Sequence, residues 1–208
     1  MQTNTMIAKP AYLGLLNAIS LAESRAGVYL CAWADATEDE DLAATLRLVA
    51  ARETSHGELF CRRLCELGYG LKPKPDPQSA ARLAKYANPK ISDCEKVGEE
   101  REEAGDPFRE INEQLADGAY DPMTANLLTW YIGEERDSAK RLKKAYASVR
   151  AKANGTQAKP ARSNGHAAMT SDPSADAEAI MACMTAGFSR LEKSLEKLAR
   201  AVKSPGRP

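Results

Sequence analysis

Apolar residues recur at alternating steps of three and four in the first part of the chain, which is the spacing of one face of an α-helix. The pattern predicts one helix over residues 10–36 and a second over about residues 38–68. The second begins in the acidic run TEDED, which favours a helix N-terminus, and Gly68 suits its C-terminal end. Because only a short link joins the two helices, we expect them to lie antiparallel.

The next part of the chain predicts a crossover and a second pair of helices. The stretch LKPKPDPQ carries three prolines and cannot be helical. A third helix is expected to start near Ser79 or Ile91 and to run through CEKVGEEREE, with a break at Gly105-Asp106-Pro107 and a short helix in FREINEQLAD. Asp121-Pro122, an N-cap residue before a first-turn proline, opens a fourth helix that continues to about Val149. Residues 1–150 are therefore expected to form an all-α domain, an antiparallel four-helix bundle.

The composition changes at residue 151. Residues 151–175 are rich in Gly, Pro, Ser and Asn, which predicts a flexible linker, and residues 176–203 predict an amphipathic helix before a tail that ends at residue 208. Such a helix is marginal alone in water, because its stability comes mainly from covering its apolar stripe. Since the linker has a long reach, we expect a second copy of the chain or another protein partner to cover the stripe.

The overall charge excludes two classes of partner. The 29 basic and 29 acidic residues cancel, so no net field attracts nucleic acid or an anionic membrane. Charged residues make up 28% of the chain and apolar residues 43%, as in soluble globular proteins. No apolar run is long enough to span a bilayer, and the N-terminus lacks the pattern of an export signal, so we expect a cytoplasmic protein.

The cysteines indicate neither a disulfide framework nor a cysteine metal site. Their number is odd and no C-x-x-C pair occurs, which argues against paired disulfides, zinc and rubredoxin-type iron. We expect reduced thiols that pack as small hydrophobic side chains. The five are Cys31, Cys61, Cys65, Cys94 and Cys183.

Ionisable residues stand in the middle of the apolar stripe on three of the predicted helices. They are Glu23 on the first, Glu53 with His56 on the second, and Glu135 on the fourth. A carboxylate taken out of water without a partner is costly. Three that converge inside one bundle indicate a shared cation, and carboxylates with one imidazole suit iron or manganese. Because Glu53 and His56 share a helix face at i and i+3, both can reach one ion.

Each of these residues has a simpler explanation when it is taken alone. The pattern E-x-x-H occurs by chance in many helices. Glu23 could pair with Arg25 or with a lysine of a neighbouring helix, and the segment EERDS around Glu135 could be a solvated face. It is the shared register of all three stripes that favours a metal site.

These residues give the chain a resemblance to the rubrerythrin branch of the ferritin-like superfamily, whose four-helix bundles bind two irons. LAESRAGVY resembles the first ligand segment, with Glu23 matching the ligand, and ARETSHGELF resembles the second, with Glu53 and His56. In the fourth helix, Glu135 matches the ligand glutamate. The resemblance covers about residues 12–148. GEERE is similar to the third-helix E-x-x-E, which assigns Glu99 and Glu102, with Glu95 or Glu103 as alternatives.

The chain departs from the family's pattern in the fourth helix. Ser138 stands where the second histidine belongs, and Glu134 and Asp137 are the alternative ligands beside it. His166, in the linker, is not expected to replace that histidine. Ser138→His is expected to strengthen metal binding by restoring the second E-x-x-H. No rubredoxin module follows the bundle, so the family's usual electron route is absent.

The resemblance implies di-iron redox chemistry with peroxide or dioxygen, as a ferroxidase, peroxidase or oxidase, with manganese as the alternative metal. Glu53 or Glu135 would bridge the ions, Glu23 and His56 would be terminal ligands, and Tyr131 could hydrogen-bond near the centre. The missing histidine and the interrupted third helix favour a different hypothesis. In that hypothesis the chain is a metal-free bundle that acts as a structural or adaptor protein through its C-terminal helix.

Overall fold

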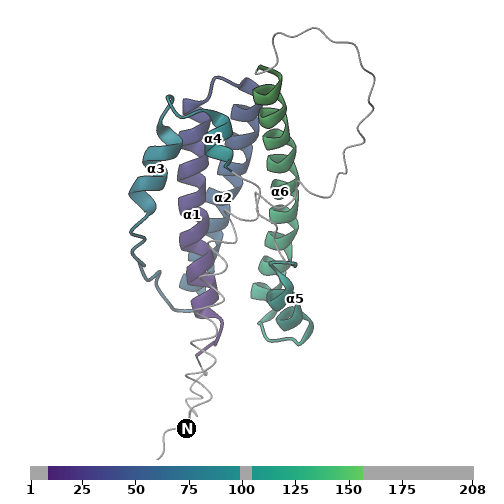
Figure 1. Ribbon diagram of the computed structural model, residues 1–208. Coiled ribbons are helices and arrows are strands. Elements are labelled where there is room, and N and C mark those ends of the chain that lie inside the picture. The colour runs from purple at the N-terminus through teal and green to yellow at the C-terminus, as the bar shows by residue number, and fades with distance from the viewer. Residues whose placement is uncertain (1–8, 99–104, 157–208) are drawn as a thin grey trace, which may run out of the picture.

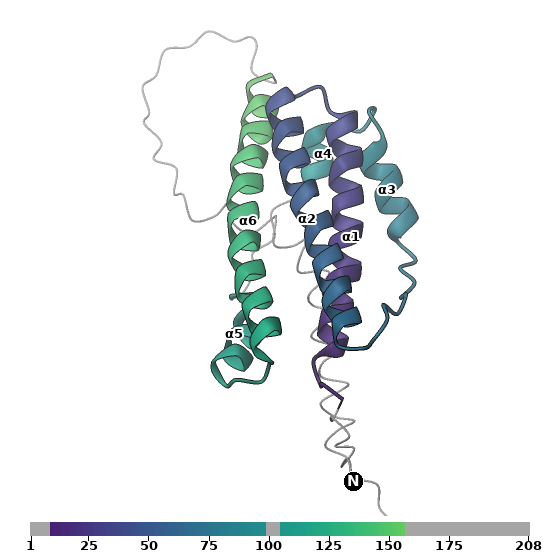
Figure 2. The ribbon, with the colours of Figure 1, turned by 180° about the vertical axis from the view of Figure 1, so that it is seen from behind.

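The computed structural model describes residues 9–98 and 105–156, and this part of the chain contains six helices and no strand. Three of the helices are long and lie side by side, and the other three are short and lie around them (Figures 1 and 2). In chain order they are α1 (Leu13–Ala36), α2 (Glu40–Glu66), α3 (Ser79–Ala87), α4 (Asp93–Val97), α5 (Arg109–Ala116) and α6 (Pro122–Thr156). Among the described helices, none combines the length and the apolar character that a membrane crossing requires.

Helix α2 runs antiparallel to both α1 and α6. Against α1, the Ser20 hydroxyl donates to the carbonyl of Gly57 at 2.7 Å, and Arg47 donates to the carbonyl of Ala34. Against α6, Arg63 donates to Thr124 near the start of that helix, at 2.9 Å. The prediction for α1 and α2 is therefore confirmed, and α1 and α6 run in the same direction.

The apolar core is divided into two clusters along the length of the three long helices. One cluster contains Leu16, Phe60 and Leu128, and the other contains Trp33 and Leu142, with further buried residues from α1, α2 and α6 in each. The first cluster draws on the start of α1 and α6 and the end of α2, and the second draws on their opposite ends. The middle turns of these three helices lie between the two clusters, and they carry the buried residues Glu23, Glu53, His56 and Glu135.

The third bundle helix expected from the sequence is not a single helix. It is replaced by α3 and α4, which are separated where Asn88 precedes Pro89, because proline disfavours the helical conformation of the residue before it. Ser92 then caps α4 through a reciprocal bond with Glu95, and Gly98 ends that helix at a φ of 76°. The segment of residues 99–104, with Glu99, Glu102 and Glu103, lies outside the described residues.

The remaining helix ends follow the local signals, with one exception. Helix α2 ends at Glu66, just before the expected Gly68, which has a φ of 83°. The proline-rich stretch after it contains no helix before the turn that leads into α3. Helix α6 instead continues past Val149 to Thr156, so residues 151–156 are helical and are not part of a linker. Residues 151–153 are Ala-Lys-Ala, which are good helix formers, and Lys152 pairs with Asp39 at the start of α2. The predicted helix over residues 176–203 lies outside the described residues.

The cysteines correct one expectation. Cys31, Cys65 and Cys94 are exposed and Cys61 is half-buried, and all four are free thiols. They lie off the apolar stripes of their helices, so they do not pack in the core as small hydrophobic side chains. Cys183 lies outside the described residues.

Candidate metal centre

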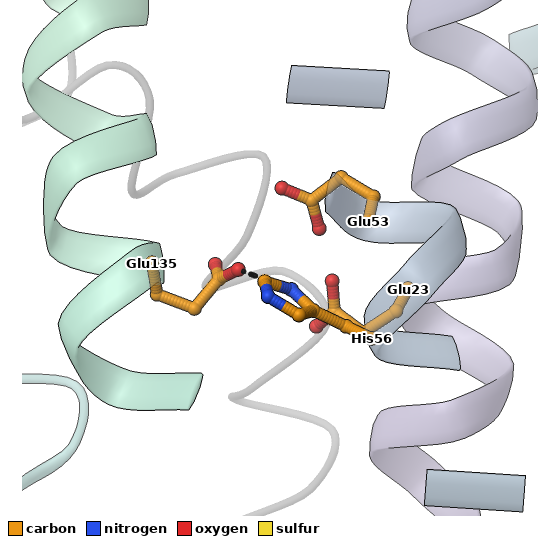
Figure 3. A group of neighbouring side chains, drawn as sticks. All are labelled: Glu23, Glu53, His56 and Glu135. Carbon is orange, nitrogen blue, oxygen red and sulfur yellow. Dashed lines mark ion pairs between the residues drawn. The ribbon is translucent and has the colours of Figure 1, made fainter. Parts of the chain in front are cut away.

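Four side chains from three helices meet between the two apolar clusters (Figure 3). Glu23 comes from α1, Glu53 and His56 from α2, and Glu135 from α6. None is more than 4% exposed, and one ligand atom from each lies within 4.8 Å of the other three. Their positions on the apolar stripes predicted that these four residues lie together in the interior, and the structure confirms this.

A close approach of α1 and α2 positions three of the four residues. A Cβ atom on Gly57 would lie 3.0 Å from the backbone nitrogen of Ser24, and one on Gly27 would lie 3.1 Å from the carbonyl oxygen of Ala50. Two glycines that face the partner helix therefore let the backbones come together, as small residues do at tight helix contacts. Glu23 on α1 and the Glu53–His56 pair on α2 point into the interior between these contacts and α6 (Figure 3).

The imidazole of His56 is held between two glutamates of α6. Its Nε2 lies 3.0 Å from Oε2 of Glu134, and its Nδ1 lies 3.1 Å from Oε1 of Glu135. The ring also stands edge-on to the rings of Trp130 and Tyr131. Burial lowers the pKa of His56, but the Glu135 and Glu134 carboxylates outweigh it, so the pKa is raised from its ordinary value.

Several buried atoms of the group lack hydrogen-bond partners among the described residues. They are Nδ1 of His56 and both carboxylate oxygens of Glu135. The 3.1 Å contact between Nδ1 and Oε1 brings opposite charges together but does not have the direction of a hydrogen bond. Buried polar atoms are nearly always paired, so this arrangement suits a ligand that several of them can coordinate together.

The carboxylates of the group are in an environment that disfavours their negative charge. Burial, and then the charge of Glu23, raises the pKa of Glu53 well above its ordinary value. Burial raises the pKa of Glu135 to about 7. The Tyr131 hydroxyl donates to Oε1 of Glu23 at 2.7 Å, and its own pKa is raised by burial and by the neighbouring carboxylates. A bound cation would relieve this crowding of like charges.

The simpler explanations of single residues do not account for the group. Arg25 donates to the carbonyl of Lys74 on the surface, whereas the partner of Glu23 is Tyr131. Glu135 is buried rather than on a solvated face. The hydrogen bond of Tyr131 to Glu23 agrees with the place that the sequence predicted for this tyrosine.

The position to which the resemblance assigns a second histidine is buried, as the stripe of α6 predicted. Ser138 is inaccessible to solvent, but it faces Arg52, whose Nη1 lies 3.3 Å from its hydroxyl oxygen. Asp137 pairs with Arg52 and with Arg141, so it does not join the four, and Glu134 reaches only His56. Sequence reasoning missed Arg52 because it lies beside the apolar stripe of α2, not on it.

The chain matches no protein-family model, no curated protein and no solved structure. The resemblance to the rubrerythrin branch therefore depends on the ligand segments themselves.

Proposed function

We propose that the chain is a ferritin-like metalloprotein that binds iron or manganese among Glu23, Glu53, His56 and Glu135. The observation that carries the proposal is the convergence of three buried carboxylates and one buried imidazole from three separate helices, with ligand atoms left unpaired. Carboxylate oxygens with a single nitrogen ligand suit iron and manganese better than they suit zinc or copper. The antiparallel four-helix form, and the roles of Glu99 and Glu102 as further ligands, belong to this proposal.

The neighbouring side chains support a metal-binding role for the imidazole. Metal-ligating histidines commonly donate their second ring N–H to a carboxylate, which fixes the tautomer. Glu134 accepts at Nε2 of His56 in this way, and this assignment leaves the lone pair of Nδ1 directed at the interior beside Glu135. Tyr131 holds Glu23 in a similar manner by donating to one of its oxygens.

The aromatic rings around the group exclude water and keep the ligands in place. Phe60 and Phe108 both pack edge-on against Tyr131, and all three rings are buried. Bound iron would supply redox chemistry with peroxide or dioxygen, which covers ferroxidase, peroxidase and oxidase reactions. The chain's own residues would hold the carboxylates in a dry interior and keep the Tyr131 hydroxyl hydrogen-bonded to Glu23.

The metal content of the protein tests this proposal. Protein purified without chelator, or reconstituted with Fe(II) or Mn(II) and desalted, should carry bound metal when it is measured by elemental analysis. His56→Ala should lower the affinity by at least about tenfold, since even the loss of a residue that supports a ligand costs that much. The matched control is Ser138→Ala, which removes a neutral hydroxyl from the next turn and should change metal content less.

A metal-free protein would support the second candidate, a structural or adaptor role for the bundle. That candidate is favoured by Ser138, which bonds to Arg52 instead of supplying an imidazole. This candidate predicts that the chain carries no bound metal after reconstitution. It also predicts that the His56→Ala and Ser138→Ala variants have the same metal content.

A further inference from the structure

An arginine stands beside the candidate metal centre at the position that the resemblance gives to a second imidazole. Arg52 precedes Glu53 on α2 and reaches across to α6 one turn beyond Glu135. Its Nη1 lies 2.7 Å from Oδ2 of Asp137 and 3.3 Å from the hydroxyl oxygen of Ser138, and its side chain is 22% exposed. A paired guanidinium is therefore fixed at the edge of the site.

This arrangement removes the ligands that a second ion would use on α6. A serine hydroxyl is neutral, and that of Ser138 already accepts a hydrogen bond from Arg52. Asp137 is bound to Arg52 and, at 2.7 Å, to Arg141, and it is partly exposed. Glu134 is engaged with His56. Glu135 is then the carboxylate that α6 directs into the centre.

The spacing of the four ligands suits one ion. Nitrogen and oxygen ligands lie about 2.0–2.2 Å from a small divalent transition ion, so two opposite ligands are about 4.2 Å apart. The ligand atoms of Glu23, Glu53, His56 and Glu135 all lie within 4.8 Å of one another. Small rotations of the side chains would bring all four around a single ion.

The balance of charge leads to the same conclusion. Among the buried ligands that the structure describes, Glu23, Glu53 and Glu135 carry three negative charges when ionised. One divalent ion offsets two of these charges, and the Arg52 guanidinium, which is paired with Asp137, lies at the edge of the group. A second divalent ion at that edge would lie beside the guanidinium in a region of low dielectric, where like charges repel strongly.

We propose that the centre binds a single divalent ion per chain, and that Arg52 is the residue that excludes a second. The inference rests on the proposed metal-binding function, and it departs from the pair of ions and from the further ligands Glu99 and Glu102 that the resemblance implies. Arg52 takes the place of the second cation, because its charge and its hydrogen bond occupy the turn of α6 on which a second imidazole would stand.

The experiment counts ions on the intact full-length protein. Wild-type protein is loaded with excess Mn(II), or with Fe(II) under anaerobic conditions, and the bound ions are counted by native mass spectrometry and by elemental analysis of the desalted sample. We expect one ion per chain. Ser138→His alone should remain at one, because Arg52 still opposes a second ion at that turn.

Three variants assign the effect to the charge of Arg52. Arg52→Gln combined with Ser138→His should bind a second ion, whereas Arg52→Lys combined with Ser138→His keeps the positive charge and should remain at one. Arg141→Gln, which removes the other partner of Asp137, is the matched control and should also remain at one. Circular dichroism and a thermal unfolding curve show that each variant is folded before its ions are counted.

The outcomes separate this inference from the function on which it rests. Wild-type protein without metal overturns the metal-binding function and this inference with it. Two ions per wild-type chain overturn this inference alone and leave the metal-binding function in place. If a folded Arg52→Gln, Ser138→His variant keeps one ion, Arg52 is not the excluding residue. If that variant does not fold, a wild-type count above one still refutes the proposal.

Discussion

Lys96 is a buried charged residue that is not one of the candidate metal ligands. The residue is 2% exposed, and its Nζ has no hydrogen-bond partner among the described residues. It lies on the short helix α4, where Asp93 accepts hydrogen bonds from Trp33 and Thr37 instead. Burial lowers the pKa of Lys96, although the Asp93 carboxylate acts in the opposite direction.

Lys96→Met should therefore stabilise the protein at pH 7, because it keeps the length of the side chain and removes the buried charge. An unpaired buried donor costs about 1–3 kcal/mol, so a gain of this order is expected in the free energy of unfolding measured with urea. Lys90→Met, at an exposed position on the preceding loop, is the control and should change little.

The pH dependence of this difference has a definite sign. The folded-state pKa of Lys96 lies below the ordinary value of 10.5, so the unfolded chain binds more protons between the two values. The stability of the wild-type protein should rise relative to the variant as the pH approaches 10, and the advantage of Met should shrink. A variant that is no more stable than wild type at pH 7 would show that other interactions offset the cost of burying the Lys96 ammonium.

At the scale of elements, the contact of α1 with α2 depends on glycine. Gly57→Ala would place a Cβ 3.0 Å from the Ser24 nitrogen and 3.1 Å from the Ser20 carbonyl oxygen. Both atoms belong to the backbone of α1, so the helix itself would have to move. We expect a loss of about 1–3 kcal/mol in the free energy of unfolding, although alanine is the better helix former.

Gly133→Ala on α6 is the matched control for this substitution. A Cβ at Gly133 meets nothing within 4 Å, so only helix propensity changes, and a gain of about 0.5–1 kcal/mol is expected. A lower free energy of unfolding for Gly57→Ala and a higher one for Gly133→Ala, both measured by chemical unfolding, would establish that close packing at Gly57 causes the loss. A Gly57→Ala protein as stable as wild type would contradict this account of the α1–α2 contact.

The start of α6 is tied to both other long helices through Asp121. Its Oδ1 accepts from the backbone nitrogens of Met123 and Thr124, as an N-cap does, and it also accepts from Arg63 of α2 at 2.8 Å. Its Oδ2 accepts from the hydroxyl of Tyr12, just before α1, at 2.6 Å. Burial raises the pKa of Asp121, but these hydrogen bonds outweigh burial and hold the pKa well below its ordinary value.

Asp121→Ala should destabilise the protein by about 1–2 kcal/mol from the lost cap alone, and by more because Arg63 loses a partner. The folded-state pKa of Asp121 is depressed, so its contribution is fully present above the ordinary value of 3.8, starts to fall below that value, and is lost as the pH falls through the lower folded-state pKa. Urea unfolding at pH 6 and pH 3 should show that the difference between wild type and variant narrows at the lower pH. An unchanged difference would mean that the carboxylate charge does not act at this position.

At the scale of the whole molecule, a polar layer lies between two apolar clusters that hold the ends of the three long helices together. This arrangement explains why buried glutamates are tolerated in the middle turns. The clusters above and below stabilise the packing, and the helices cannot turn these side chains outward without also exposing their apolar stripes.

The sequence predicts that residues 176–203 mediate a homo-oligomer or bind a protein partner. A chain that ends after Thr156 keeps every described helix and should have a lower mass in solution, measured by light scattering, if the full chain self-associates. Leu191→Lys with Leu195→Lys, on the predicted apolar stripe, should have the same effect in the full-length chain, and Lys193→Ala should not. An unchanged mass, together with an unchanged set of bound proteins, would contradict the prediction.

Local patterns in the sequence were sufficient for the long helices and for the interior position of four candidate metal ligands. Gly68 and Asp121-Pro122 mark helix ends through contacts between near neighbours, and the apolar stripes specify which face of each helix is buried. Glu23 and Glu135 lie on those faces, so their burial could be predicted without knowing how the helices pack.

The tertiary structure alone decided what surrounds these residues. Arg52 lies beside the stripe of α2, yet its long side chain crosses to Ser138, and Glu134 rather than Asp137 reaches His56. Such contacts depend on the distance and rotation between α2 and α6, which the packing of buried residues from both helices sets. Spacing within one helix specifies a face, but the end point of a flexible side chain is determined by the helix opposite, because that helix supplies its partner.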